Sequence, residues 1–443
     1  MKTAGKPEPL RPPAFTYQSR AGRNARAPRT GSLPPELFCE SVALERLADR
    51  HGTPLYVYSA EMIRARIRAF QRAFRAIPST LCYSVKANST LAILRLIARE
   101  RAGFDVVSGG ELKRVLRVAP RAARNVVFSG VGKTLEEMDL ALEAGILLFN
   151  VESGPEARNL ATLAALRKIC APIAIRVNPD VSAKTHPYIS TGLHEHKFGV
   201  PISEAKQLYA RAARERYLKV AGVSVHIGSQ ITDVGSFQEA LKRVADLVRD
   251  LRKQGHDIRY VDAGGGLGIS YEGPQHRFAE QISAYADAVL KPLRGLDVHL
   301  LVEPGRSIVG PAGVLLTRVL YRKTNNHKRF LIVDAAMNDL LRPSLYRAYH
   351  EIVPVTCRSQ EKEITDVVGP VCETGDFFAR DREMPVAAEE DLLAILDAGA
   401  YGAVLSSNYN SRGRPAEVLV DGTKARVIRH RESIKDQLRL ERL

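Results

Sequence analysis

Short apolar runs recur along the middle of the chain and alternate with longer segments of helical periodicity. Strands that alternate with helices in this way are typical of parallel sheets with helical crossovers. Eight such runs in succession predict a closed α/β barrel of the TIM type, whose active site lies at the carboxyl ends of its strands. The expected strands are Leu81–Val85, Phe104–Val107, Asn125–Phe128, Leu147–Val151, Ile173–Val177, Val223–Ile227, Tyr260–Ala263 and Leu300–Val302. The clearest helical segments are Thr90–Arg101, Leu135–Ala144, Pro155–Lys168, Phe237–Gln254 and Phe278–Leu293.

The pattern changes after Pro311. Shorter β-type runs follow without a helix after each, at Val314–Leu320, Phe330–Val333 and Ala416–Val420. Runs of this kind predict a second, β-rich domain. The expected organisation is a disordered basic tail at 1–30, a segment at 31–53 that joins the β-rich domain, a barrel at 54–310, and a C-terminal β-rich domain at 311–443.

The charge of the chain is concentrated at its N-terminus. The formal net charge is +16, and residues 1–30 alone carry seven Lys/Arg against one Glu. This proline-containing basic segment is typical of a solvated tail. An organelle transit peptide is the minority interpretation of this segment, because the prolines disfavour the amphipathic helix that such a peptide forms. A nucleic-acid partner is therefore not expected.

The apolar pattern and the cysteines also indicate in which cellular compartment the protein is expected. No apolar stretch approaches the roughly 20 residues that a membrane-spanning helix needs, and we expect no signal peptide. The five cysteines, at 39, 82, 170, 357 and 372, are scattered and lack CxxC spacing. That pattern favours neither a disulfide framework nor a zinc site. We expect a cytoplasmic enzyme without a bound metal and without a membrane partner.

Polar residues that need an explanation follow the predicted strands one after another. A single polar residue at a strand end is ordinary turn chemistry, but the carboxyl ends of barrel strands meet at one face. The succession therefore predicts a ring of polar groups around one active site. Its members are Lys86, Asp105 with Ser108, Ser129 with Gly130, Glu152, Arg176 with Asn178, His226, Gly264–Gly266 and Glu303.

Lys86 closes the first of these apolar runs, within Tyr83-Ser84-Val85-Lys86-Ala87-Asn88. A lysine just past a strand end can simply be solvated. In a partly desolvated pocket its amine loses some of its preference for the protonated form, and it can form a Schiff base with an aldehyde. If Lys86 holds an aldehyde cofactor, later strand ends must supply a phosphate cradle, a partner for a ring nitrogen and groups that hold an amino acid.

Later strand ends contain candidates for each of these tasks. The glycines of Gly264-Gly265-Gly266-Leu267-Gly268 would let backbone N–H groups approach a phosphate, and the hydroxyl of Ser229 could donate to it. Glu303 beside a pyridine nitrogen would favour its protonated, electron-withdrawing form. Arg306 could bind a phosphate or carboxylate with two parallel hydrogen bonds. Taken alone, each feature also fits a turn or a salt bridge.

Together these motifs resemble the fold-type III pyridoxal-phosphate-dependent decarboxylases, and within them the family that acts on diaminopimelate. The resemblance covers the chain from about residue 33 to its C-terminus and does not include the tail. It rests on Tyr83–Asn88, His226–Ser229, Gly264–Gly268, Glu303–Arg306, Asn178–Val181 through His186–Gly192, Lys197–Gly199, Leu341–Tyr346, Val371–Asp376 and Gly399–Gly402. The chain departs from the family pattern at Thr374, where serine is more usual, and at Gly413, where proline is expected.

The resemblance implies a role for each matched residue. Lys86 would bind pyridoxal 5'-phosphate covalently, His226 would stack on its ring, and Cys372 would donate the proton that completes the product. Cys372 and Glu373 would reach the site from a partner subunit, which implies a homodimer with shared active sites. The implied cofactor contacts are Lys86, His226, Ser229, Gly265, Gly266, Glu303, Pro304, Gly305, Arg306 and Tyr401. The implied substrate contacts are Arg306, Arg342, Tyr346, Glu373 and Tyr401.

The implied reaction is decarboxylation of meso-diaminopimelate to L-lysine and CO2, the last step of lysine biosynthesis by that route. Alternatives on the same barrel are an ornithine or arginine decarboxylase and a racemase, and a non-catalytic cofactor-binding regulator is a further class. Arg342 would repel a cationic substrate end that lacks a carboxylate. A racemase would need a second catalytic base, and a regulator would have lost some of Lys86, Cys372 and Tyr401, all of which are present.

Overall fold

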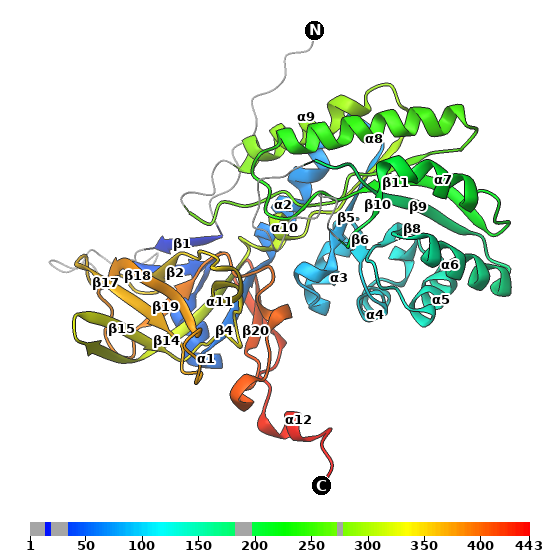
Figure 1. The fold of residues 1–443 in the computed structure, drawn as a ribbon. Helices are drawn as coiled ribbons and strands as arrows, with labels where there is room; N and C mark the ends of the chain where they lie inside the picture. Colours follow the sequence, from blue (N-terminus) through cyan, green and yellow to red (C-terminus); the bar gives the residue numbers. More distant parts are fainter. Residues whose placement is uncertain (1–13, 19–33, 182–196, 273–277) are drawn as a thin grey trace. The chain divides into compact units, whose positions relative to one another are not determined.

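The computed structural model describes residues 14–18, 34–181, 197–272 and 278–443. Within these residues the chain forms two compact units, which are coloured along the sequence in Figure 1. The barrel unit comprises residues 64–269 and 278–308. The β-rich unit comprises the described residues up to 63, together with 270–272 and 309–443.

The barrel unit is built on a closed parallel sheet. Its strands follow the order β9-β11-β12-β13-β5-β6-β7-β8, and β8 pairs with β9 to complete the circle. All eight predicted strands are confirmed, and so is the barrel fold class. A short strand, β10 (Val200–Pro201), pairs beside β9. The barrel strands are β5 (Ser79–Ser84), β6 (Gly103–Val106), β7 (Val126–Phe128), β8 (Leu148–Val151), β9 (Ala171–Asn178), β11 (Leu218–Val225), β12 (Tyr260–Asp262) and β13 (His299–Val302).

Helices follow the strands and lie outside the barrel sheet (Figure 1). The strands are buried on both faces because side chains fill the barrel interior and the helices cover its outside. This double burial explains why the strands read as continuous apolar runs. The helices are α2 (Ala60–Ala73), α3 (Leu91–Arg99), α4 (Gly109–Val118), α5 (Leu135–Ala144), α6 (Gly154–Arg167), α7 (Ile202–Ala212), α8 (Gly235–Lys253), α9 (Phe278–Leu293) and α10 (Arg306–Val309), with 3-10 turns η1 (Val85–Ala87) and η2 (Pro120–Asn125).

Consecutive strand-to-helix turns use a hydroxyl cap followed three residues later by glutamate. Thr134 and Glu137 form a complete capping box at the start of α5, each side chain bonding the other's backbone N–H. Ser153 caps α6 by accepting from the Glu156 N–H, and the Glu156 carboxylate also accepts from the N–H of Glu152 at 2.9 Å. These turns fix where each strand ends, and therefore fix the side chains displayed at the carboxyl face.

The β-rich unit contains a nine-stranded sheet and a three-stranded sheet. The larger sheet follows the order β18-β17-β15-β14-β4-β20-β21, with β16 and β19 paired alongside β14. Its strands are β4 (Leu55–Ser59), β14 (Gly313–Asn325), β15 (Lys328–Val333), β16 (Ile352–Pro354), β17 (Lys362–Val368), β18 (Phe377–Pro385), β19 (Leu392–Ile395), β20 (Ala416–Asp421) and β21 (Lys424–Arg429). The smaller sheet contains β1 (Phe15–Gln18), β2 (Glu36–Cys39) and β3 (Val42–Ala43). The unit's helices are α1 (Leu44–His51), α11 (Arg342–Tyr346) and α12 (Ile434–Leu438), with 3-10 turns η5 (Ala403–Leu405) and η6 (Tyr409–Ser411).

The structure differs from the expected organisation at two places. Strand β4, expected within the barrel domain that begins at 54, pairs with β14 and β20 in the larger sheet of the β-rich unit. Its five residues are all buried, so it needs a sheet with partners on both sides. The tail is not wholly without structure either, because Phe15–Gln18 pairs antiparallel with β2. The remainder of the expected tail lies outside the described residues, apart from Ala14.

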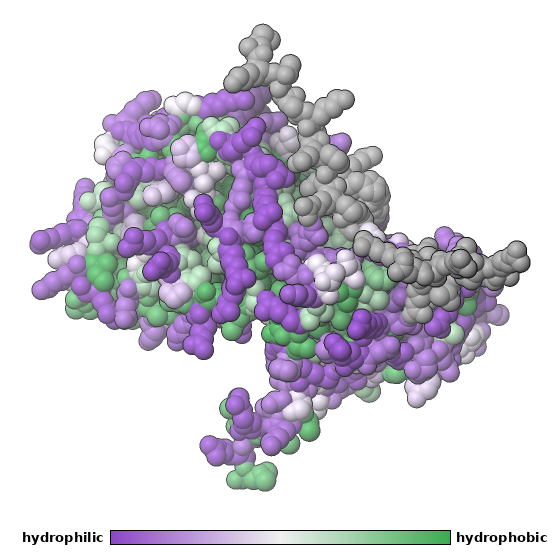
Figure 2. Space-filling model, turned by 180° about the vertical axis from the view of Figure 1, so that it is seen from behind, coloured by the Kyte–Doolittle hydropathy of each residue, from purple (hydrophilic) through white to green (hydrophobic). Residues whose placement is uncertain are grey.

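The surface is largely polar on the face shown in Figure 2, where hydrophilic side chains predominate and apolar ones are interspersed. None of the helices in the described part of the chain combines the length and apolar composition that a membrane crossing requires.

An aromatic cluster lies on the outside of the barrel sheet, where α2, α8 and α9 come together. Tyr285 of α9 meets Phe237 of α8 edge to face, with ring centroids 4.8 Å apart, and meets Phe74, which follows α2, at 5.7 Å. All three rings are buried. Edge-to-face pairs add to the stabilisation that burial alone provides.

Replacing Phe74 by Ala should therefore lower the free energy of unfolding by about 3–5 kcal/mol, because it leaves a cavity in this cluster. The measurement is urea unfolding followed by circular dichroism. Leu166→Ala is the control, since the Leu166 side chain lies on the surface and is 77% exposed. Equal losses in the two variants would contradict a packing role for the cluster.

Candidate active site

Lys86 lies in the 3-10 turn η1, directly after β5. Its Nζ is 2.6 Å from Oδ2 of Asp105, which lies on the neighbouring strand β6. The Lys86 side chain is 35% exposed, whereas that of Asp105 is fully buried. The turn is braced by the Tyr83 hydroxyl, which donates to the carbonyl of Asn88 at 3.0 Å. Lys86 is therefore paired with a buried carboxylate, which a merely solvated lysine would not be.

Asp105 is held from a second direction. The Ser84 hydroxyl lies 2.8 Å from Asp105 Oδ2 and 3.0 Å from the carbonyl oxygen of Glu303, so it connects β5 to both neighbouring strands. Oδ1 of Asp105 is buried and has no hydrogen-bond partner among the described residues. An acceptor left unsatisfied in this way is costly, which is typical of a site arranged for a ligand.

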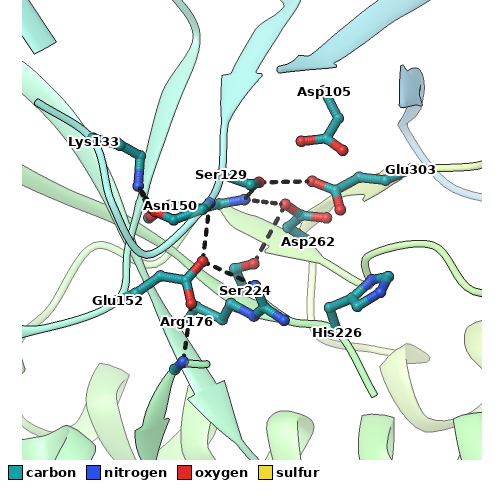
Figure 3. Close-up of polar contacts among 12 residues, drawn as sticks. Asp105, Ser129, Lys133, Asn150, Glu152, Arg176, Ser224, His226, Asp262 and Glu303 are labelled. Carbon is teal, nitrogen blue, oxygen red and sulfur yellow. Dashed lines mark hydrogen bonds and ion pairs between the residues drawn. The ribbon is translucent and has the colours of Figure 1, made fainter. Parts of the chain in front are cut away.

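A polar network crosses the barrel end next to this pair (Figure 3). The amide Nδ2 of Asn150 donates to Asp262 Oδ2 at 2.6 Å and to Ser129 Oγ at 3.0 Å. The Ser129 hydroxyl in turn donates to Glu303 Oε1 at 3.3 Å. Asp262 also accepts from the Gly264 N–H at 2.9 Å. These contacts bring together residues from β8, β12 and the ends of β7 and β13.

Burial and neighbouring carboxyl groups together set the electrostatics of the two acids in this network. Burial raises the pKa of Glu303 well above its usual range, and the nearby carboxyl groups of Asp105 and Asp262 raise it further. Burial also raises the pKa of Asp262, although hydrogen bonds from Glu303 and from the Gly264 N–H partly offset that effect. A carboxyl group with a raised pKa can hold a proton near neutral pH.

His226 follows β11 at the same face, and its ring is held in one tautomer. The Gly265 N–H donates to Nδ1 at 3.1 Å, so the ring proton of the neutral imidazole is on Nε2. Burial lowers the pKa of His226 well below its usual value, and the positive charges of Arg176 and Lys86 lower it further. His226 therefore presents a neutral flat ring, which suits stacking on another aromatic ring.

The glycine loop after β12 approaches neighbouring backbone closely. Gly266 has a φ of +105°, and a Cβ there would lie 2.2 Å from the carbonyl oxygen of Gly228. A Cβ on Gly265 would lie 2.1 Å from the carbonyl oxygen of Glu303. Only glycine allows this approach. Beside the loop, Arg306 Nη2 donates to the Ser229 hydroxyl at 3.0 Å, which places a cation and a hydroxyl together.

Glu152 and Arg176 form a buried ion pair with 2.9 Å between Oε1 and Nη1. Glu152 also accepts from the Gly130 N–H at 2.9 Å and from the Gly199 N–H at 3.0 Å. The Arg176 guanidinium lies over the Phe198 ring, 4.8 Å from its centroid. Glu152 and Arg176 therefore hold the loop around Gly199 against the strand ends. The sequence did not indicate this positioning role.

Other members of the expected ring serve local structure. Ser108 caps α4 by accepting from the Glu111 N–H. Asn178 Oδ1 accepts from the Asp180 N–H at 2.9 Å, which shapes the turn after β9. The motif His186–Gly192 lies outside the described residues.

Asn150, Ser224 and Asp262 belong to the site although the sequence did not indicate them. Asn150 and Asp262 link the carboxyl network directly, and the Ser224 hydroxyl lies 3.4 Å from Asp262 Oδ2. Asn150 and Ser224 lie within their strands and Asp262 is the last residue of β12, so none of them follows a strand as the expected ring residues do. Attention to polar residues within buried strands could have found them, because such groups need partners.

The β-rich unit contains the other predicted residues. Arg342 begins α11 and is buried, with Nη1 2.7 Å from His350 Nε2 and its guanidinium 4.6 Å from the centre of the Tyr271 ring. Tyr346, at the end of α11, is partly buried. Tyr401 is also partly buried and has a φ of +56°, which is unusual for a residue with a side chain.

Cys372 and Glu373 lie on an exposed turn of the β-rich unit. The turn is organised around the buried carboxylate of Asp376, which accepts from the N–H of Val371 at 2.7 Å and of Met337 at 2.6 Å. The Cys372 N–H donates to Oδ1 of Asn410 at 2.9 Å. The backbone of the turn is thus fixed while the thiol and the carboxylate remain in solvent.

Comparison with known proteins identifies the family. The family described as pyridoxal-dependent decarboxylase, pyridoxal binding domain, matches residues 60–310. The diaminopimelate decarboxylase of Pseudomonas aeruginosa is 53% identical over 401 residues, which cover 90% of this chain and 95% of that protein. The chain belongs to the diaminopimelate decarboxylase family.

Other members of the diaminopimelate decarboxylase family agree in sequence and in structure. The enzyme of Neisseria meningitidis serogroup B is 49% identical over 403 residues, covering 91% of this chain and 96% of that protein. The crystal structure of the Helicobacter pylori enzyme complexed with L-lysine has a TM-score of 0.85 at 45% identity and covers 89% of this chain and 98% of that one. The protein is accordingly a pyridoxal-phosphate-dependent carboxy-lyase, as the sequence predicts.

The residues at the barrel end fit the cofactor of the diaminopimelate decarboxylase family. Lys86 offers an amine, and the glycine loop with Ser229 and Arg306 offers an anion cradle that any Cβ would fill. The buried acid Glu303 can face a ring nitrogen, and the neutral His226 can cover a ring. When bound, pyridoxal phosphate supplies an electron sink for the reacting carbon.

Replacing Gly266 by Ala should weaken cofactor binding by about tenfold or more, because an L residue strains the backbone at this φ and its Cβ meets the Gly228 carbonyl. The measurement is a pyridoxal phosphate titration followed by absorbance. Gly132→Ala is the matched control, because a Cβ there meets nothing within 4 Å. Wild-type affinity in Gly266→Ala would contradict the assignment of this loop to the phosphate.

Proposed function

We propose that this protein decarboxylates meso-diaminopimelate to L-lysine and CO2 in the last step of lysine biosynthesis. The observation that carries the proposal is the Lys86–Asp105 pair beside a glycine cradle and the buried acid Glu303. These groups lie in a chain that is 45–53% identical to enzymes named diaminopimelate decarboxylase.

The proposed division of labour follows from where each group lies. The Lys86 amine would hold the cofactor through its aldehyde, and Asp105 would keep that amine oriented. Glu303 stabilises a proton on the ring nitrogen, and His226 covers the ring. The phosphate and ring would be surrounded by Ser229, Gly265, Gly266, Pro304, Gly305 and Arg306. Gly265 would contribute only the close approach of its backbone, because its N–H is already bonded to His226.

The substrate's far end carries an ammonium and a carboxylate, and it therefore needs both an acid and a base. Arg306 and Arg342 are proposed to hold carboxylate groups and Glu373 the ammonium, with Tyr346 and Tyr401 beside them. Tyr401 is also proposed to contact the cofactor. Arg342 suits this task because His350 and Tyr271 already fix its guanidinium. Ornithine and arginine lack the distal carboxylate, so the same guanidinium would repel their cationic ends.

A homodimer with shared active sites is part of the proposal. Cys372, the proposed proton donor, and Glu373 are exposed on a turn whose backbone is fixed, which suits side chains that serve a partner subunit. A cytoplasmic location is proposed because the thiols of Cys170 and Cys372 are free and exposed, a state that a reducing compartment preserves.

The first test is CO2 release from meso-diaminopimelate, ornithine and arginine by protein reconstituted with pyridoxal phosphate. We expect release from diaminopimelate alone, and a fall to background in Lys86→Ala because this change removes the amine proposed to bind the cofactor aldehyde. Lys113→Ala, which removes an exposed lysine of α4, should keep wild-type activity. Release from ornithine or arginine at a comparable rate would favour the alternative decarboxylases.

The second test mixes two inactive variants, Lys86→Ala and Cys372→Ala, by co-expression. If Cys372 acts in the partner's site, half of the dimers are mixed and one of their two sites is intact, so about a quarter of wild-type activity should return. Cys372→Ala alone should keep its cofactor absorbance, and Cys170→Ala is the control for removing an exposed thiol. A mixture that stays inactive would contradict shared sites.

A further inference from the structure

Two buried carboxyl groups at the barrel end, Asp262 and Glu303, lie beside each other without a counter-ion (Figure 3). Among the residues that the structure describes, neither forms an ion pair. The lysine amine at this face is paired with Asp105 at 2.6 Å. Two negative charges so placed would repel each other strongly in a medium that screens them poorly.

The hydrogen bonds around the two acids point to a proton between them. The carboxyl groups of Asp262 and Glu303 lie within hydrogen-bonding reach of each other (Figure 3). Ionised carboxylates only accept hydrogen bonds, so a bond between two carboxyl groups requires that one of them carries a proton. Asn150 supports this arrangement because its Nδ2 donates to Asp262 at 2.6 Å and, through Ser129, it reaches Glu303.

The other titratable groups that face the pair do not supply the missing charge. Lys86 is engaged with Asp105, which is itself an acid. Burial raises the pKa of Cys82 and of Tyr285, and the carboxylates nearby raise it further, so both remain neutral near pH 7. Burial likewise raises the pKa of both Asp262 and Glu303.

We propose that Asp262 and Glu303 share a single proton in the cofactor-free barrel, and that Asp262 is a positioning residue for Glu303. Asp262 thereby sets how readily Glu303 ionises opposite a ring nitrogen, a consequence that rests on the proposed role of Glu303. The proton passes between Oδ of Asp262 and Oε of Glu303 without a change in the total charge of the pair. Asn150 and the Gly264 N–H, as donors to Asp262, favour the state in which Glu303 carries the proton until the ring arrives.

The test is infrared spectroscopy of the full chain freed of cofactor at pH 7, which distinguishes protonated carboxylic acids from carboxylates. We compare the wild type with Asp262→Asn, Glu303→Gln and the double variant. One shared proton predicts that each single variant loses the absorbance of one protonated acid and that the double variant loses no more. Glu111 and Asp339, whose pKa burial raises to about 7, cancel in the difference spectra.

Two outcomes would overturn the proposal. If Asp262→Asn keeps the acid absorbance, Glu303 is protonated by burial alone; if the double variant loses twice as much as either single variant, each acid holds its own proton. A purely structural Asp262 would lower the melting temperature without changing the acid absorbance. Should Asp262→Asn fail to fold, Glu303→Gln labelled with carbon-13 in aspartate answers the same question: one shared proton leaves Asp262 as a carboxylate in that variant, whereas separate protons leave it as an acid.

The experiment uses neither cofactor nor substrate. A negative result therefore leaves the assay of CO2 release unaffected, and a failure of that assay leaves the shared proton intact. The two proposals stand or fall separately.

Discussion

The active end of the barrel depends on how three buried carboxyl groups are neutralised. Burying an unpaired carboxylate lowers the free energy of unfolding by roughly several kcal/mol, even after the protein relaxes. Asp105, Asp262 and Glu303 are all buried. Lys86 neutralises the first by direct contact, and hydrogen-bond donors satisfy the other two. The pairing has a chemical consequence, because it holds the amine proposed to react with an aldehyde at a fixed position beside its acceptor. Stability and reactivity thus depend on the same few groups.

Backbone contacts position the anion cradle with little contribution from side chains. A Cβ on Gly264 would lie 2.4 Å from the Val225 carbonyl, and one on Gly265 would lie 2.1 Å from the Glu303 carbonyl. The loop after β12 therefore lies directly against the ends of both neighbouring strands. Rotamer changes cannot move such a contact, so the cradle keeps its distance from Glu303 and His226. This rigidity suits the proposed arrangement, in which the cofactor ring would meet an acid and an imidazole at once.

The sequence predicts most of the barrel because each of its strands is apolar on both faces and is followed by a helix or a loop. It also predicts that Lys86, Asp105, Glu303 and His226 share one face, since parallel strands align their carboxyl ends. It could not assign Asp262 or Asn150, whose partners lie on strands distant in sequence. Nor could it place strand β4, because an entirely buried strand reads alike whether it joins a barrel or a β-sheet. The pairing of Phe15–Gln18 with β2 was likewise hidden, since a short strand in a basic segment has little apolar signal.

The turn that bears Cys372 and Glu373 presents an unusual combination of rigidity and exposure. Asp376 is buried and receives two backbone N–H groups, and the Ser344 hydroxyl fixes the turn again by donating to the Gly375 carbonyl at 2.6 Å. Ordering backbone costs about 1–2 kcal/mol per residue in conformational entropy, yet the two side chains at its tip pack against little within the chain. A turn that merely connected β17 to β18 would not need this support. The same rigidity would reduce the entropy lost if the tip entered the site of a partner subunit, in keeping with the role proposed for the exposed thiol and carboxylate.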